Sequence, residues 1–388
     1  MLQIDHIYEF LYHEVFLDFE VWNPFNGVFK SGPINKSTDI SVFTPRNSKA
    51  KMFFYDQEPF ILDVSQGYLD IFKNYNSKPP VLVTSEHSLA IDQYCAELMA
   101  KKLYYFFHGF AAVDWYRSHY ALNYNKLIVK PYKHDFISFN RIINNDRSYR
   151  IYFVSLLKEQ ELLSQGLVSF GVTDNLFDDW QDETANSNSK LSDRAKLHAE
   201  HHLVDINKLI IDRASIHGSA SADIPRTLQG WWPNNDQPNV DAFWHVVTET
   251  VFYYDKLHLT EKIFKPIVSK QPFMLLAAPG NLAYLKSYGF KTFDSVIDET
   301  YDTIQDNDRR TEEVVGQLHW YCNLTPGEKT DVIKQLEPII DYNFHHFYGE
   351  FRHIITRELL DNTKTLFKEL NYDDRHINYD NIYHVLTN

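Results

Sequence analysis

The chain has 388 residues and a formal net charge of -14, and 44% of its residues are hydrophobic and 15% aromatic. This apolar content excludes a wholly disordered chain. At about 100–200 residues per domain, the length predicts two domains. The negative charge argues against a long-range electrostatic hold on nucleic acid or on an anionic membrane. Two cysteines, Cys95 and Cys322, provide neither a disulfide framework nor a Cys-rich zinc site, which indicates a reducing compartment.

The first residues, MLQIDHIYEFLYHEVF, form an amphipathic pattern that contains acidic residues, unlike a signal peptide. No stretch approaches the roughly 20 apolar residues that a membrane helix requires. We therefore expect a soluble cytoplasmic protein that inserts nothing into a membrane. The composition leaves the oligomeric state open.

In the first third of the chain, short apolar runs alternate with polar turns and helical patterns. The helical pattern is clearest at Leu89–Lys101. The strand-like runs are Lys51–Tyr55, Pro80–Thr84, Leu103–Phe107 and Lys126–Val129. This alternation predicts βα units and a largely parallel sheet.

A second series of the same kind follows. A helical period covers Arg150–Leu163, and long helical patterns run from Thr311 to Phe367. Strands are expected at Phe136–Phe139, Leu167–Phe170 and Pro272–Ala277, with a further apolar run at Phe243–Val251. The polar segment Asp174–Asp193 is typical of a mobile loop and not of a buried element.

The boundary between the two series is expected near Pro131–Asp135. The sequence thus predicts an α/β protein with two Rossmann-like domains, residues 1–133 and 134–325, that face a cleft. Residues 326–388 are expected to form C-terminal helices that pack across both domains. In such sheets ligands bind beyond the carboxyl ends of the strands.

The strongest local signal is FWHVVTETVFYYDKLHLTEKIFKP, from Phe243 to Pro266. Thr260 is a favourable N-cap, with Glu261 and Lys262 in the first helical turn. Free N–H groups at a helix start attract a diphosphate, and Lys262 would add a full charge. A carboxylate such as Glu249 or Glu261 can accept hydrogen bonds from ribose hydroxyls. The alternative is that Thr260 and Glu261 merely cap a helix and Lys262 is solvated.

The stretch from Glu249 through Thr260–Glu261–Lys262, followed by the apolar run QPFMLLAAPG, resembles the donor-binding region of the α1,3-fucosyltransferase family and of similar proteins encoded by tailed phages. In FISFNRIINNDRSYRIYFVSLL, Arg150 matches the phosphate-binding Arg of that family. In VTSEHS, Glu86 takes the place of its proposed general base. The resemblance covers about residues 80–300.

Three positions depart from the pattern of this family. Ser85 replaces a Gly before the proposed base, and Thr250 replaces the Asn after the first Glu. Pro266 follows the helix start closely and should distort the second turn, because it lacks an N–H.

The resemblance implies a GT-B glycosyltransferase that inverts configuration, uses no cofactor and needs no metal. Its co-substrate would be a GDP- or UDP-linked sugar held by residues 134–325, with the acceptor on the side of residues 1–133. Such a transfer requires a carboxylate to deprotonate the acceptor hydroxyl and cations to stabilise the leaving diphosphate. Arg150 and Lys262 would supply the charge, with Arg141 and Arg147 in reserve.

Other carboxylates could also serve as the catalytic base. FFYDQEPF places Asp56 and Glu58 after an apolar run, and FFHGFAAVDWYR places His108 and Asp114 after another. Residues just past a strand lie where ligands bind. The catalytic candidates are therefore Glu86, Asp114 and Glu58. The structural alternatives are a helix cap for Asp114 and a turn residue for Glu58.

Several further patterns are discounted as functional sites. Asp306–Asn307–Asp308 fits a metal-binding Asp-x-Asp pattern, but its polar surroundings predict a solvated loop. His198, His201 and His202 have a helical spacing that could ligate a metal, but no further ligand can be assigned, so no metal site is expected. Trp231 and Trp232 could stack a base or a sugar. The absence of G-x-G-x-x-G and P-loop patterns argues against an ordinary dehydrogenase or ATPase.

The acceptor hydroxyl could belong to a glycan or to a modified DNA base. In the second case the protein would be a phage enzyme of the host cytoplasm that glycosylates hydroxymethylated cytosine. A local basic groove for DNA could then be formed by Lys101, Lys102, Lys126, Lys130 and Lys133. A non-catalytic carbohydrate- or nucleotide-binding protein is the alternative from another class.

Overall fold

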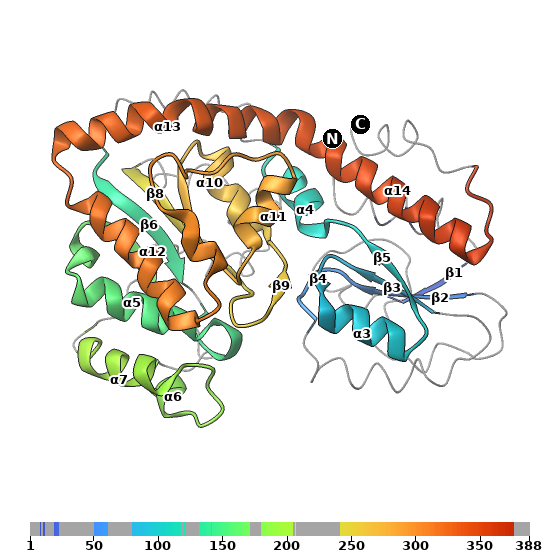
Figure 1. Ribbon diagram of the computed structural model, residues 1–388, viewed down its shortest axis with the longest axis horizontal. Helices are drawn as coiled ribbons and strands as arrows, with labels where there is room; N and C mark the ends of the chain where they lie inside the picture. The colour runs from blue at the N-terminus through green and yellow to red at the C-terminus, as the bar shows by residue number, and fades with distance from the viewer. Residues whose placement is uncertain are drawn as a thin grey trace, which may run out of the picture. The chain divides into compact units, whose positions relative to one another are not determined.

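The computed structural model describes Tyr8, Leu11, Tyr120, residue 206 and residues 19–22, 50–60, 80–117, 132–140, 142–170, 180–204 and 241–375. They fall into two compact units (Figure 1). Unit 1 consists of Met1–Asp114, Lys256–His258 and Gly349–Asn388. Unit 2 consists of Trp115–Asp255 and Leu259–Tyr348. The domain limits at 133/134 and 325/326 remain predictions.

Unit 1 contains a four-stranded parallel sheet in the order β1-β2-β3-β5. Its strands are β1 (Phe19–Trp22), β2 (Ala50–Tyr55), β3 (Val81–Thr84) and β5 (Lys101–Tyr104). A short antiparallel pair is formed by β4 (His87–Ser88) and β9 (Lys256–Leu257). The helices among its described residues are α3 (Leu89–Glu97), α4 (Phe107–Trp115) and α14 (Arg352–Leu370). All four residues of β3 are buried, as expected for a parallel strand covered on both faces.

Unit 2 contains a second four-stranded parallel sheet, in the order β10-β8-β6-β7. Its strands are β6 (His134–Asn140), β7 (Gly166–Phe170), β8 (Ala242–Thr248) and β10 (Phe273–Leu276). The chain passes from β6 to β7 on one side and later enters β8 on the other side of β6. This reversal is a topological switch point, which is the preferred ligand position in open α/β sheets.

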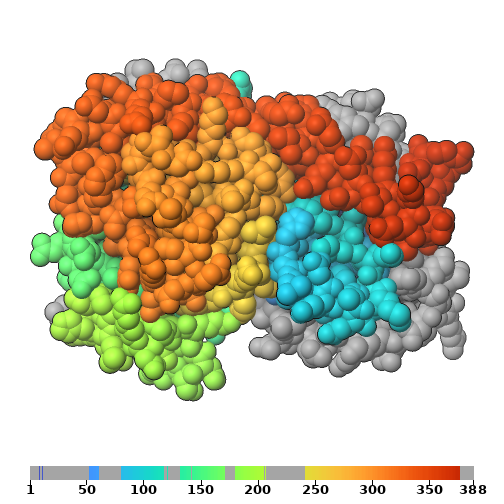
Figure 2. Space-filling model, in the orientation of Figure 1, coloured from blue at the N-terminus to red at the C-terminus, as the bar shows by residue number. Residues whose placement is uncertain are grey.

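The helices of unit 2 follow its strands in the chain. The first group is η3 (Asn145–Arg147), α5 (Tyr149–Glu159), η4 (Leu162–Ser164), α6 (Trp180–Ala185) and α7 (Asp193–His202). The second group is η7 (Glu261–Ile263), α10 (Phe264–Val268), α11 (Asn281–Ser287), η8 (Glu299–Thr303), α12 (Asn307–Cys322) and α13 (Pro326–His346). The π turn η9 (Phe347–Phe351) contains the boundary between the two units. In the space-filling view, α6 and α7 (yellow-green) lie at the lower surface of unit 2 (Figure 2).

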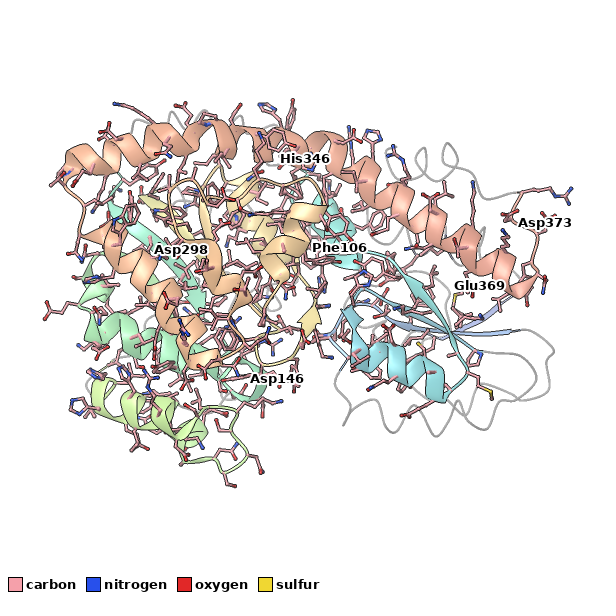
Figure 3. The ribbon with its side chains drawn as sticks, viewed as in Figure 1. Phe106, Asp146, Asp298, His346, Glu369 and Asp373 are labelled. Carbon is pink, nitrogen blue, oxygen red and sulfur yellow. The ribbon has the colours of Figure 1, made fainter. Side chains whose placement is uncertain are left out.

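Local sequence explains how α13 begins and how it packs. Thr325 and Glu328 form a capping box, with Pro326 at the first helical position. Near its C-terminal end, His346 is buried, and its Nε2 lies 2.7 Å from the carbonyl oxygen of Tyr288 (Figure 3). His346 is therefore a packing residue.

The structure confirms an α/β protein whose two main sheets are parallel. The predicted strands at Lys51–Tyr55, Pro80–Thr84, Phe136–Phe139, Leu167–Phe170 and Pro272–Ala277 are present as β2, β3, β6, β7 and β10. The run Lys126–Val129 lies outside the described residues. Among the described helices, none has the length and apolar character needed to cross a membrane.

Two expectations about particular segments are wrong. The polar segment Asp174–Asp193 is not entirely a loop, because Trp180 begins α6 and is buried, and Ser192 caps α7 through the backbone N–H of Ala195. Glu183 and Thr184 of α6 are buried as well, so this part of the polar stretch packs against the unit. The run Leu103–Phe107 is not one strand either, since β5 ends at Tyr104 and α4 begins at Phe107.

Candidate functional site

The carboxyl ends of β6 and β8 meet at the switch point of unit 2. Strand β6 ends at Asn140, and β8 ends at Thr248, which is followed by Glu249 and Thr250. Together with Thr260 and Lys262, these residues define what we call the switch-point site. All of them belong to unit 2.

Asn140 offers an acceptor at this site. Its backbone N–H donates to Ser169 Oγ at 2.8 Å, and its Nδ2 donates to Ser138 Oγ at 3.1 Å. These bonds fix the side chain, whose Oδ1 is buried and accepts no hydrogen bond from any residue that the structure describes. A buried acceptor without a donor costs free energy. A ligand N–H or O–H group at Oδ1 would remove that cost.

Glu249 organises the loop that carries Thr260. The residue is fully buried, and its Oε1 accepts a hydrogen bond from the Thr260 backbone N–H at 3.1 Å. Its Oε2 accepts from Thr260 Oγ1 at 2.6 Å and from the Thr250 backbone N–H at 3.1 Å. A carboxylate has about four acceptor positions, so little capacity remains for ribose hydroxyls. The contacts make Glu249 a residue that positions Thr260.

Thr260 begins η7, and Lys262 presents its ammonium group beside it. Thr260 Oγ1 accepts from the Lys262 backbone N–H at 3.4 Å, which confirms the predicted helix start. Lys262 Nζ donates to Thr250 Oγ1 at 3.1 Å and to Thr260 Oγ1 at 3.0 Å. It lies 3.4 Å from Glu261 Oε1, and the lysine side chain is 37% exposed. Lys262 therefore offers an accessible positive charge at the switch point.

Arg150 is brought to the same edge, but its guanidinium is used within the protein. Its NH2 donates to the Thr248 carbonyl at 2.7 Å and its NH1 to the Ile142 carbonyl at 2.9 Å. The residue is 3% exposed. Beside it, Tyr149 donates its hydroxyl to the Glu249 carbonyl at 2.6 Å. These bonds attach the start of α5 to the end of β8, and phosphate binding by Arg150 stays a prediction. Arg141 lies outside the described residues.

The carboxyl edge of the unit 1 sheet carries a second polar group. Asp56 directly follows β2, and its Oδ2 accepts hydrogen bonds from Tyr105 and, at 2.9 Å, from Tyr8. Burial raises the pKa of Asp56 from 3.8 to about 6, although the two tyrosine hydroxyls act in the opposite direction. Its Oδ1 accepts no hydrogen bond among the described residues.

Glu86, the base that the resemblance implies, forms a buried ion pair. Its Oε1 lies 2.8 Å from Lys256 Nζ and also accepts from Ser88, while Oε2 accepts from the Phe60 backbone N–H at 2.7 Å. The side chains of Glu86 and Lys256 are 1% and 6% exposed. Lys256 comes from β9, which pairs with β4, and lies 170 residues away in sequence. No local pattern could have predicted this partner.

The two other predicted bases differ in their surroundings. Glu58 is exposed in the turn before Pro59, as its structural alternative proposed. Asp114 is buried in the last turn of α4, so it does not cap the start of that helix. The neighbouring His108 lies with Nε2 3.0 Å from the Gln57 carbonyl oxygen.

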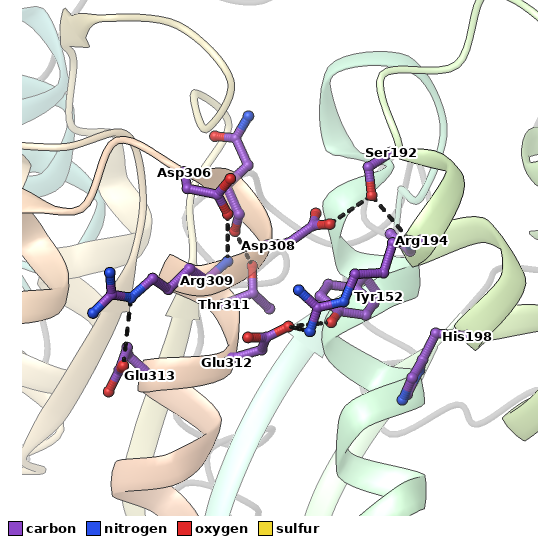
Figure 4. Close-up of polar contacts among 12 residues, drawn as sticks. Tyr152, Ser192, Arg194, His198, Asp306, Asp308, Arg309, Thr311, Glu312 and Glu313 are labelled. Atoms are coloured by element: carbon purple, nitrogen blue, oxygen red, sulfur yellow. Dashed lines mark hydrogen bonds and ion pairs between the residues drawn. The ribbon is translucent and has the colours of Figure 1, made fainter.

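The discounted Asp-x-Asp pattern forms a helix start. Asp306 caps α12 by accepting from the Arg309 backbone N–H at 2.8 Å, and Asp308 Oδ2 accepts from Ser192 Oγ at 2.5 Å (Figure 4). The expectation of a solvated loop is therefore wrong for Asp308, which holds α12 to the cap of α7. The tandem Trp231 and Trp232 lie outside the described residues.

The lysines considered for a DNA groove are paired with acids where the structure describes them. Lys101 pairs with Glu369, Lys102 with Asp92 and Lys133 with Asp241. Lys126 and Lys130 lie outside the described residues. The paired charges reduce the local positive potential that phosphate binding would require.

Comparisons of the chain with protein-family models, with curated proteins and with solved structures found no match.

Proposed function

We propose that the protein is an inverting glycosyltransferase of the GT-B type, which transfers a sugar from a GDP- or UDP-linked donor to an acceptor hydroxyl. The observation that carries the proposal is the switch point of unit 2, where Lys262 and the buried Oδ1 of Asn140 lie at the carboxyl ends of adjacent strands. The resemblance of the Thr260–Glu261–Lys262 segment to a nucleotide-sugar site supports the same assignment.

In this proposal Lys262 stabilises the charge that develops on the departing nucleotide diphosphate. Its ammonium donates to two neutral hydroxyls and, at 3.4 Å, to Glu261 Oε1, and its side chain is 37% exposed, so an anion can approach it. A fixed cation at a leaving phosphate stabilises the transition state without reorganisation. Glu249 acts indirectly, by holding Thr260 in place.

Asp56 is proposed as the general base, in preference to Glu86. A base works best when its pKa lies near the operating pH, and the pKa of Asp56 is raised to about 6. In contrast, both oxygens of the Glu86 carboxylate already accept hydrogen bonds, and Oε1 also lies 2.8 Å from the Lys256 ammonium. A glycan acceptor is favoured over DNA, because the described lysines of the expected groove are paired.

A thermal-shift panel with GDP, UDP and their sugar conjugates tests the donor site. A ligand that binds the native state raises the transition temperature, so we expect a shift with one nucleotide series. Lys262→Ala should abolish most of this shift. Lys334→Ala is the matched control, since this lysine of unit 2 is exposed and forms its ion pair with Asp331, away from the switch-point site.

Two outcomes would contradict the proposal. If the wild-type protein binds no nucleotide and no nucleotide sugar, the glycosyltransferase assignment fails. If Lys262→Ala binds the nucleotide as tightly as the wild-type protein and the Lys334→Ala control do, the switch-point site is not the donor site.

A further inference from the structure

We propose that Glu159, His198 and His202 form a binding site for a divalent transition metal, with Zn²⁺ as its best-suited occupant. One ligand atom from each of the three residues lies within 4.8 Å of the other two. Glu159 is the last residue of α5, and the histidines are one helical turn apart on α7. The site thus joins the ends of two helices of unit 2.

The spacing of the ligand atoms suits a small tetrahedral ion. Zn²⁺ binds imidazole nitrogen and carboxylate oxygen at about 2.0–2.2 Å, which places neighbouring ligand atoms about 3.3 Å apart. His198 Nε2 lies 3.4 Å from Glu159 Oε2, and His202 Nε2 lies 3.9 Å from Glu159 Oε1. The first two atoms are already at the required separation. A small rotamer change of His202 would bring its Nε2 to the same separation from the Glu159 carboxylate.

The hydrogen bonds of His198 fix which of its nitrogens faces the site. Ser155 Oγ donates its single proton to the Tyr152 carbonyl at 2.7 Å, and it lies 2.8 Å from His198 Nδ1. With its proton already committed, Ser155 Oγ accepts from Nδ1–H, so the lone pair of the neutral ring is on Nε2. That Nε2 is buried and makes no hydrogen bond with any described residue. A metal-binding histidine held by its second nitrogen in this way is the usual arrangement.

The three groups gather their possible ligand atoms in one place. The two imidazole rings lie with centroids 4.3 Å apart, and the Glu159 carboxylate lies beside both of them. A positive ion among them would be attracted by the carboxylate and by the lone pairs of the neutral rings. No fourth His, Cys, Asp or Glu is grouped with the three among the described residues.

A cavity beside the site leaves room for solvent to complete the coordination. Its volume is about 270 Å³, and its walls include Glu159, His198 and His319. The ion pair of Arg194 and Glu312 lines the same cavity, next to Tyr152 (Figure 4). Three protein ligands with an open position resemble the arrangement that zinc adopts when a water or a ligand occupies the fourth place.

The site is separate from the switch-point site. Arg150 is at the start of α5 and Glu159 at its end, which corresponds to roughly 14 Å along the helix axis. A metal at this position would hold α7 against α5 and would not take part in sugar transfer. Metal binding at this site can therefore be tested independently of the proposed function.

Metal binding is tested on the full chain after treatment with EDTA and dialysis. Zn²⁺ is titrated in competition with a chromophoric chelator, and Co²⁺ is added separately to observe the visible absorption of a tetrahedral ion. We expect one tight equivalent, and a Kd that rises at least tenfold in Glu159→Gln and in His202→Ala. Ser155→Ala should raise the Kd by about 10–100-fold, as loss of an orienting partner does.

His201→Ala is the matched control, because this exposed histidine of α7 is not part of the group. Its Kd should stay at the wild-type value. Circular dichroism of the metal-free variants checks folding, and Glu159→Gln keeps the test usable if a histidine variant unfolds, since Glu159 is exposed at a helix end. The proposal is overturned if the wild-type protein takes up no tight equivalent, or if the control weakens binding as much as the ligand variants do.

Discussion

The raised pKa of Asp56 makes stability depend on pH in a direction opposite to that of most carboxylates. Burial raises this pKa from 3.8 to about 6, so between these values the folded protein holds a proton that the unfolded chain has released. The free energy of unfolding therefore falls as the pH rises through this window, and the protonated form below it carries no penalty. At 1.36 kcal/mol for each pKa unit, the loss amounts to roughly 3 kcal/mol.

Asp56→Asn removes the titration and keeps the local contacts. Both tyrosine hydroxyls donate to Oδ2, so an amide oxygen at that position can accept the same bonds. Denaturant unfolding of both proteins at pH 4, 5, 6 and 7, followed by circular dichroism, gives the difference in unfolding free energy at each pH. We expect that difference to change by about 2.5 kcal/mol in favour of the variant between pH 4 and pH 7, since other groups contribute equally to both proteins. A difference that stays constant with pH would refute the reasoning.

Two further predictions concern buried charges. Arg150→Ala should lower the free energy of unfolding by about 2–4 kcal/mol, because the carbonyls of Ile142 and Thr248 lose charge-assisted hydrogen bonds. Urea unfolding measures this change. A change below about 0.5 kcal/mol would show that these bonds do not hold α5 to β8. Glu86→Gln should cost about 3–5 kcal/mol, because it removes the carboxylate that pairs with the buried Lys256 ammonium. Adding Lys256→Met should recover most of this loss in thermal unfolding, and additive losses would disprove the pairing.

Much of the fold could be predicted because parallel strands buried on both faces leave a clear pattern. The runs FISF and KMFFY are mostly apolar, with one polar residue each, and they became β6 and β2 with small changes at their ends. The polar stretch that contains α6 could not be predicted in this way. The buried residues of α6 are Trp180, Glu183 and Thr184, and the cap of the following helix α7, Ser192, is tied to Asp308 in a distant helix.

The candidate site was predicted where its chemistry is local in sequence. Thr260 capping a helix with Lys262 beside it follows from three consecutive residues, and the structure has that arrangement. The partners of Glu86 and Arg150 could not be predicted, because burial and pairing with distant groups decide what a charged side chain does. Lys256 reaches Glu86 through strand pairing, and Arg150 donates to carbonyls that any sequence would provide.

The proposed metal site also could be predicted only in part from the sequence. The spacing of His198 and His202 indicated a possible pair of ligands, but a third ligand had to come from elsewhere in the chain. Glu159 supplies it because α5 ends beside α7, and Ser155, one turn earlier, turns His198 toward it. Since this contact lies at the end of α5 away from the switch point, a bound metal would stabilise unit 2 without touching the switch-point site. Removing the metal should accordingly lower the transition temperature and leave nucleotide binding to the folded protein unchanged, a result that activity measurements alone could not give.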